Sequence, residues 1–141
     1  MRKLLAFLAV VAVTACDSRI GGSFVAPQTP TIVGSFKLQS FNGKAPPTVI
    51  NAGATDTTTV VGDTLTFGSD KSLRRVLVTV TTPPANAQQI AGVASGTYTL
   101  TSGALSLTFQ NGTGLVTFLA TLNGSLVTVN DNNDIWVYQK F

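Results

Sequence analysis

The feature that most constrains the fold is a series of short segments in which apolar and polar residues alternate, separated by tight turns. The clearest segments are residues 96–101, 104–110, 115–122, 125–129 and 134–140. Alternation with period two is the pattern of a strand with one buried face. The turns between these segments hold Ser102-Gly103, Asn111-Gly112, Asn123-Gly124 and residues 131–133. Such turn residues, with Asn-Gly as a preferred type I′ pair, predict an antiparallel meander of hairpins.

The preceding part of the chain continues the pattern with longer connections. Phe36 and Leu38 alternate with polar neighbours in a first strand. Further strands are expected at residues 48–51, 64–67 and 73–82. Residues 51–59 and 85–95 are expected to be loops, and the second has room for a short helical turn because residues 85–91 lack Pro and Gly.

These segments define an all-β chain of eight or nine strands at roughly ten-residue spacing. A sheet of about eight strands with one apolar face closes into a barrel or splits into a sandwich. The short hairpins from Gly96 onward favour a small antiparallel up-and-down barrel, in which the first strand pairs with the last. The alternative is a β-sandwich of the immunoglobulin type, which needs longer crossovers.

The barrel interpretation assigns one face of each strand to the interior. The residues expected inside are Phe36, Leu38, Leu65, Phe67, Val76, Val78, Tyr98, Leu100, Leu105, Leu107, Phe109, Val116, Phe118, Leu126, Trp136 and Tyr138. An eight-stranded barrel has room for side chains or for one small ligand. So many large side chains predict a packed interior.

The N-terminus has the pattern of an export signal. Arg2 and Lys3 precede an apolar stretch at residues 4–13, which is too short to span a bilayer. Val13-Thr14-Ala15-Cys16 resembles the lipobox of bacterial lipoproteins, in which the cysteine becomes the lipid-modified first residue. We therefore expect a signal peptide at residues 1–15, a lipidated N-terminus and flexible tether at residues 16–31, and a β-barrel domain at residues 32–141.

This resemblance implies a protein anchored in a bacterial cell envelope through lipid on Cys16. Several acyl chains hold a protein far better than one, because each buried CH₂ adds about 0.8 kcal/mol. Asp17 follows the cysteine and resembles the inner-membrane retention signal of enterobacteria. Other lineages sort differently, so both membranes, and both a periplasm-facing and a surface location, stay open.

Charge and composition exclude several functions. Nine Lys and Arg residues oppose six Asp residues, and removal of Arg2 and Lys3 leaves seven against six, a net charge of +1. This balance gives no basis for nucleic-acid binding, which needs a clustered basic stripe. The chain has no His and no Glu, and its one Cys is the expected lipid site, so the usual catalytic bases and nucleophiles are missing. We expect no enzyme, no cofactor and no metal site.

Three segments resemble the small bacterial lipocalin-like lipoproteins. They are residues 34–47 (GSFKLQSFNGKAPP), residues 96–103 (GTYTLTSG) and residues 134–140 (DIWVYQK). The resemblance covers roughly residues 31–141, although Gly34-Ser35-Phe36 stands where larger lipocalins have Gly-x-Trp. It implies an eight-stranded barrel and, more loosely, a binding function.

Two groups of residues are candidates for ligand binding. Arg74 and Arg75 lie side by side in a predicted strand, so their side chains point to opposite faces. We expect the pair at a strand end with both charged groups in water, since buried Arg is rare. The alternative is that one points inward and binds a carboxylate headgroup. Tyr98, Trp136 and Tyr138 are candidates for a cavity lining, but core packing is the stronger expectation.

The sequence therefore predicts a non-enzymatic binding domain at the cell envelope. Its ligand is either a small apolar molecule or an envelope protein, and the packed interior favours the protein. A second hypothesis is a structural or surface-assembly lipoprotein in which a sandwich offers open strand edges. A third is an enzyme inhibitor that uses the predicted loop at residues 85–95. The run Asp131-Asn132-Asn133-Asp134 lacks the length of a calcium loop and is expected to be a hairpin turn.

Overall fold

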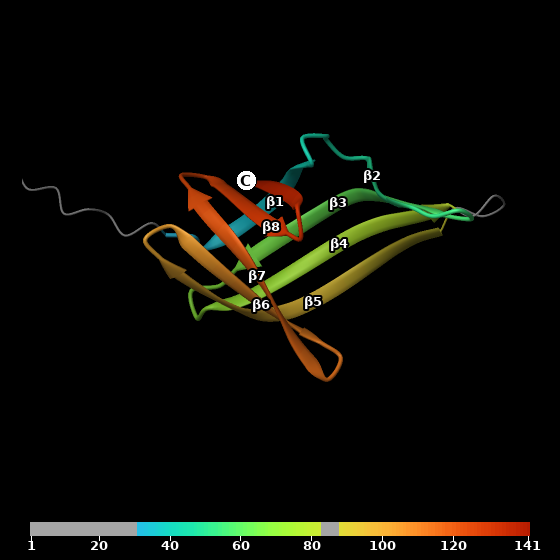
Figure 1. Ribbon diagram of the computed structural model, residues 1–141. Coiled ribbons are helices and arrows are strands. Elements are labelled where there is room, and N and C mark those ends of the chain that lie inside the picture. Colours follow the sequence, from blue (N-terminus) through green and yellow to red (C-terminus); the bar gives the residue numbers. More distant parts are fainter. Residues whose placement is uncertain (1–30, 83–87) are drawn as a thin grey trace, which may run out of the picture.

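The computed structural model describes residues 31–82 and 88–141, and almost all of them belong to strands or tight turns (Figure 1). The strands are β1 (Gly34–Phe41), β2 (Thr48–Ala52), β3 (Thr57–Phe67), β4 (Ser72–Thr82), β5 (Gln88–Thr101), β6 (Ala104–Asn111), β7 (Gly114–Asn123), β8 (Leu126–Asp131) and β9 (Asp134–Lys140). No helix in this part of the chain is long and apolar enough to cross a membrane.

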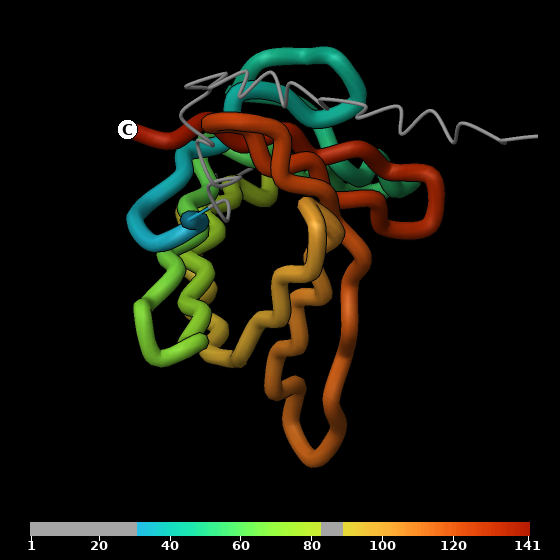
Figure 2. Tube along the Cα trace, turned by 90° about the vertical axis from the view of Figure 1, so that its left-hand side faces the viewer, coloured from blue at the N-terminus to red at the C-terminus, as the bar shows by residue number. Residues whose placement is uncertain are grey.

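The strands form a closed antiparallel up-and-down barrel of eight strands with one additional strand. Strands β3 to β8 each pair with the next strand along the chain, and β1 closes the ring by pairing with both β9 and β3. The additional strand is β2, which pairs with the first half of β3. Figure 2 shows the strands as a ring around the barrel centre. The predicted fold class and the pairing of first with last strand are confirmed, and the sandwich alternative is excluded.

Alternating side chains fill the barrel. The buried apolar residues are Ile32, Phe36, Leu38, Phe41, Val60, Leu65, Phe67, Leu73, Tyr98, Leu105, Leu107, Phe109, Ala120, Leu122, Val127, Val129, Trp136 and Tyr138. They form a single hydrophobic cluster against which Leu77, Leu100 and Phe118 pack. Near the β3–β4 turn the rings of Phe36, Phe67 and Tyr98 meet edge to face, with centroids 5.4 and 5.1 Å apart. Edge-to-face aromatic pairs add stabilisation beyond their buried area.

Three residues expected inside face outward instead. Leu65 pairs with Arg75, so the inward positions of β4 are Leu73, Arg75 and Leu77. Val76 and Val78 therefore lie on the outer face, where they are only partly buried. The central part of β4 is apolar on both faces, so its alternation did not identify the buried face. Leu126 is also outside and is 38% exposed, because Val127 and Val129 are the inward residues of β8.

The loops expected at residues 51–59 and 85–95 are both shorter. Strand β3 begins at Thr57, and β5 begins at Gln88. Residues 88–95 pair with β4 residue by residue, although Ala and Gly in this segment have low strand propensity. Pairing with the long strand β4 therefore overrides local preference. The rest of the second predicted loop, residues 85–87, lies outside the described residues.

The hairpin turns are of two kinds. Asn132 and Asn133 both have positive φ, as a type I′ turn requires, and so do Ser102 and Gly103. The turns after β6 and β7 have positive φ only at Gly112 and Gly124, as in type II′ turns. The tight turns were predicted correctly. The assignment of Asn-Gly as a central type I′ pair was wrong for these two hairpins, because Asn111 and Asn123 are the last residues of their strands.

Gly96 marks the point where β5 and β6 separate. Pairing between β5 and β6 runs only from Gly96–Phe109 to Thr101–Ala104, whereas β5 continues along β4 back to Gln88. A Cβ atom at Gly96 would overlap the carbonyl oxygen of Thr108. The two strands therefore cross closely here and then diverge. Figure 1 shows the β6–β7 hairpin projecting from the barrel while β5 curves away with β4.

We expect Gly96→Ala to lower the free energy of unfolding by about 3 kcal/mol, because the added methyl group forces two backbones apart. Gly92→Ala is the matched control in the same strand, since a Cβ there meets only the carbonyl of Leu77 at 3.8 Å. It should change stability by no more than about 0.5 kcal/mol. Chemical denaturation of both variants measures this, and equal destabilisation would contradict the close crossing.

Candidate functional site

Arg75 lies inside the barrel wall, on the inward face of β4. It pairs with Leu65 of β3 on one side and with Ala94 of β5 on the other. Its side chain is 19% exposed, whereas the neighbouring Arg74 is on the outer face and exposed. The expectation that both charged groups lie in water is therefore wrong for Arg75. The small side chain of Ala94 leaves space beside it for the guanidinium.

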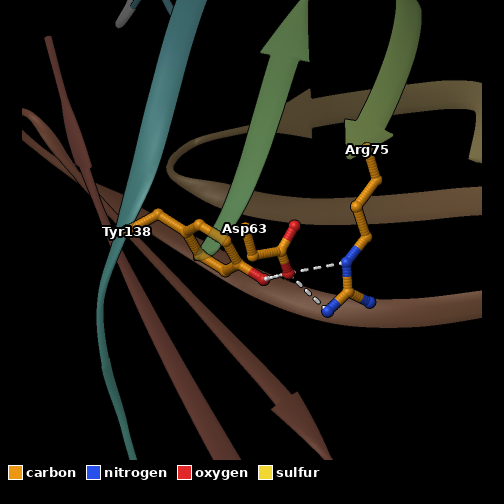
Figure 3. A network of polar contacts seen from close by, with 3 residues as sticks. All are labelled: Asp63, Arg75 and Tyr138. Atoms are coloured by element: carbon orange, nitrogen blue, oxygen red, sulfur yellow. Dashed lines mark hydrogen bonds and ion pairs between the residues drawn. The ribbon is translucent and has the colours of Figure 1, made fainter. Parts of the chain in front are cut away.

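Asp63 holds the Arg75 guanidinium by two contacts to one oxygen. Nε of Arg75 donates to Oδ2 of Asp63 at 2.8 Å, and Nη2 lies 2.6 Å from the same atom. The hydroxyl of Tyr138 also donates to this oxygen, at 2.8 Å (Figure 3). The Asp63 side chain is fully buried. Three donors from β4 and β9 thus converge on one carboxylate oxygen from β3.

The other oxygen of Asp63, Oδ1, is buried and has no hydrogen-bond partner among the described residues. An unpaired buried acceptor costs about 1–3 kcal/mol. The ion pair therefore adds little net stability compared with an apolar replacement, although loss of either partner alone is costly. Its clear effect is to fix the orientation of Arg75.

Asp63 did not emerge as a site residue from the sequence. The predicted strand at residues 64–67 began after Asp63, whereas β3 begins at Thr57, so Asp63 fell in a predicted connection. Its spacing from Leu65 and Phe67 is two and four residues, which is the period of one strand face. This spacing was the available signal. A carboxylate on the inward face of a strand calls for a cation on a neighbouring strand, and Arg75 is that cation.

Charge and burial act together on the pKa values of this cluster. Burial lowers the pKa of the Arg75 guanidinium, but attraction to Tyr138, Asp63 and Asp131 outweighs burial and raises it. Burial raises the pKa of Tyr138 well above 10, opposed in part by Arg75 and reinforced by Asp63. At neutral pH Arg75 is therefore charged, and Tyr138 is a neutral donor.

The positive charge of Arg75 is already compensated. Asp63 neutralises it directly, and Asp131 lines the same small cavity. An arriving carboxylate would thus meet one cation and two carboxylates. A neutral acceptor is the better partner for Nη1, which makes no hydrogen bond with the described residues.

Two of the three aromatic candidates lie beside Arg75. The guanidinium stacks 4.8 Å from the centre of the Trp136 ring, which also meets Phe41 at 4.6 Å. Trp136 and Tyr138 are both buried, so core packing describes them well. Tyr98 lies elsewhere, since it is four residues along β5 from Ala94 and donates to the Gly68 carbonyl. Of the five candidates, the structure brings together Arg75, Trp136 and Tyr138.

The barrel interior is filled at this level. The cavity beneath Arg75 measures about 10 Å³, which is near the minimum for a single water molecule. Larger clefts open at both ends of the barrel, one of about 210 Å³ beside the β3–β4 turn and others at the opposite end, which we call the mouth. One cleft of about 290 Å³ lies between β5 and the β6–β7 hairpin. Its lining residues are Arg75, Val93, Ala94, Phe109, Gln110, Asn111, Val116 and Phe118.

The acidic run at residues 131–134 is a hairpin turn between β8 and β9, as expected. Asp134 accepts a hydrogen bond at 2.9 Å from Asn42, which joins this turn to the end of β1. Across residues 31–82 and 88–141, no three His, Cys, Asp or Glu side chains cluster as a metal site would require. Cys16 lies outside the described residues.

Comparison with known proteins gives no family assignment. No protein-family model matches the chain, and no curated protein matches its sequence. The eight-stranded antiparallel barrel agrees with the fold that the lipocalin-like resemblance implies. Inferences about function therefore depend on the geometry of the barrel and its mouth.

We expect Arg75→Met to cost about 3–5 kcal/mol of unfolding free energy, because it leaves the buried Asp63 carboxylate without a counter-charge. Arg74→Met is the matched control on the exposed face and should cost no more than about 0.5 kcal/mol. Adding Asp63→Leu to Arg75→Met should recover much of the loss. Equal stabilities of the Arg75 and Arg74 variants in urea unfolding would show that the pair is not buried.

Ionisation of Tyr138 should be coupled to unfolding. Its pKa in the folded state is raised above the unfolded value near 10, so its contribution to stability is complete below about pH 10 and is lost as pH rises through the folded value. The chain has two tyrosines, so the Tyr98→Phe variant reports on Tyr138 alone. We expect tyrosinate absorbance in this variant to rise together with loss of the barrel signal in circular dichroism. A rise in absorbance while the barrel is intact would contradict the buried hydrogen bond.

Proposed function

We propose that the protein is a lipid-anchored, non-enzymatic binding module of a bacterial cell envelope, with a lipocalin-like barrel that binds a protein partner. The observation that carries the proposal is the filled barrel interior. Pockets for small ligands typically measure about 300–1,000 Å³ and enclose most of the ligand. The cavity inside this barrel is about 10 Å³, so the available binding surfaces lie at its mouth and on its strand edges.

The chemistry of Arg75 supports a protein partner over a small amphiphile with an acidic headgroup. Asp63 and Asp131 already balance the guanidinium, which removes the driving force for capture of a free carboxylate. The open clefts at the mouth are shallow and partly polar, with the amides of Gln110 and Asn111 in one wall. A surface of this kind suits a polypeptide, which offers neutral carbonyl acceptors next to apolar side chains.

The place where the chain joins the barrel supports the same proposal. Gly34, at the start of β1, pairs with Phe67 at the end of β3. Residues 31–33 lie beside the β3–β4 turn and Tyr98, at the end of the barrel opposite the mouth. In a protein held by lipid on Cys16, the tether therefore enters the barrel at the far end. The mouth then lies at the end of the barrel away from the point where the tether attaches, where it is accessible to partners.

The loop on which the enzyme-inhibitor hypothesis depends is shorter than the sequence predicted. It placed a plug in a loop at residues 85–95, but residues 88–95 form the first half of β5. Only residues 85–87 of that predicted loop are left outside β5, and the structure does not describe them. The unpaired edge of β5 is a more specific candidate surface for binding a protein partner.

Mass spectrometry of the full-length protein purified from its host envelope tests the proposal in one preparation. Under denaturing conditions we expect a chain that begins at Cys16 and carries covalent lipid. Under native conditions we expect no additional small-molecule mass. An unmodified cysteine would contradict lipid anchoring, and a bound small molecule that is lost on denaturation would show a carrier of small ligands instead.

A further inference from the structure

The first half of β5 has one unpaired edge. Residues 88–95 pair with β4 on one side, and the pairing with β6 begins only at Gly96. Within the described part of the chain, no strand lies along the other side of this segment. Eight consecutive residues of a barrel wall are therefore available for main-chain pairing.

The register identifies which backbone groups face this open edge. The N–H of Tyr98 donates to the carbonyl of Lys71, on the β4 side. In a regular antiparallel pair, groups that face one neighbour alternate with groups that face the other. The residues whose N–H and C=O groups face away from β4 are thus the odd-numbered ones. They are Gln89, Ala91, Val93 and Ser95.

This edge lacks the features that usually protect strand edges. Residues 88–95 (QQIAGVAS) contain no charge and no proline, and their register with β4 has no bulge. Natural proteins normally protect long edges with charges, prolines or bulges. The outer edge of β2, in contrast, belongs to a strand of five residues whose register is shifted between Val49 and Asn51. Ile90 and Val93 also remain 51% and 58% exposed beside the open edge of β5.

We propose that an uncharged, extended segment of a partner protein binds here by adding a strand to β5. This inference rests on the proposed function, since it specifies how the protein partner is held. Main-chain hydrogen bonds to the four odd-numbered residues supply affinity, and side-chain contacts on alternate positions supply specificity. The absence of charge on the edge favours a partner segment that is also uncharged.

A cleft of about 290 Å³ lies at the end of this edge, between β5 and the β6–β7 hairpin. Its walls are Val93 and Ala94 of β5 on one side and Gln110 and Asn111 of the hairpin on the other. The β5 strand of a second copy would bring its own β4 along its other edge, so a paired sheet would have to enter the space between β5 and the hairpin. A single extended segment has no second edge to accommodate. A foreign strand therefore fits this cleft better than a second copy of the chain.

Arg75 and two aromatic rings select the side chain that enters the cleft. A partner residue opposite Ala94 directs its side chain toward the inner face, where Arg75, Phe109 and Phe118 line the cleft. The rings favour an apolar side chain. Because Asp63 and Asp131 compensate Arg75, an acidic side chain at this position gains little from the guanidinium.

The test uses a library of random linear nonapeptides displayed on phage, selected against the full-length protein in lipid nanodiscs. We expect selected peptides to be uncharged at their central positions with apolar residues at alternate sites. Residue-resolved hydrogen exchange with a selected synthetic peptide should then slow exchange at Gln89, Ala91, Val93 and Ser95. The amides of Ile90, Gly92 and Ala94 already bond to β4 and should change little.

Two variants and a control test the edge itself. Ala91→Pro removes one donor on the open edge, and Val93→Lys adds a protecting charge, so each should weaken peptide binding at least tenfold. Leu119→Lys is the matched control, because Leu119 is 71% exposed on a strand paired on both sides. It should leave binding unchanged. Val93→Lys keeps the test valid if Ala91→Pro fails to fold.

Several results would overturn the inference. They are slowed exchange outside the β5 edge, equal weakening by Val93→Lys and Leu119→Lys, and failure of the library to yield a binder. Dimerisation without peptide that Val93→Lys abolishes would show that the edge serves a second copy instead. These results leave the proposed envelope-binding function intact, because that proposal fails only on the lipid and small-molecule masses described above.

Discussion

The structure depends on the position of β1, which pairs with two strands at once. Its pairing with β9 and β3 closes the ring of eight strands. Closure obliges every inward side chain to share one interior, so Phe36 and Tyr138 from opposite ends of the chain are both fully buried. A small barrel of eight strands satisfies this condition with side chains alone, and here they leave a cavity of only about 10 Å³. A binding partner therefore has to use the mouth or the strand edges of the barrel, because the interior is filled.

Closure also explains why an unpaired edge remains. The strands β3, β4 and β5 have 11, 11 and 14 residues, whereas β1 has 8 and β9 has 7. The long strands therefore extend past the ring that the short strands can close. Strand β2 covers the excess of β3, and β4 lies between its two neighbours. The excess of β5 has no such cover, because the close crossing at Gly96 directs β6 away.

The sequence predicted the fold where local patterning and pairing agree, and it failed where they differ. Strand β9 was predicted with its exact observed limits, residues 134–140, because alternation and a strong turn coincide there. Residues 88–95 were mistaken for a loop, since small residues carry weak strand signals and only their pairing with β4 makes them a strand. In the site, Trp136 and Tyr138 were anticipated from one strand face, whereas Asp63 was missed because the predicted strand began after it, and its contact with Arg75 follows from the pairing of β3 with β4. Contacts between strands are decided by register, and the pattern of β4, which is apolar on both faces, did not show that Arg75 points inward beside β3.

The buried cluster of Arg75, Asp63 and Tyr138 lies where the ring of strands ends and the overhanging strands begin. The small residues Gly92 and Ala94 explain this position. They pair with Leu77 and Arg75 of β4, and their lack of large side chains leaves space on the inner face of β5. Apolar residues could fill that space, and replacement of buried ion pairs by apolar groups is often neutral or stabilising. An apolar group, however, has no directional requirement, whereas the guanidinium is held by two contacts to one oxygen and by the Trp136 ring. The cluster therefore joins β3, β4 and β9 in one register and keeps a polar donor at the base of the mouth cleft, next to the edge where we place the partner strand.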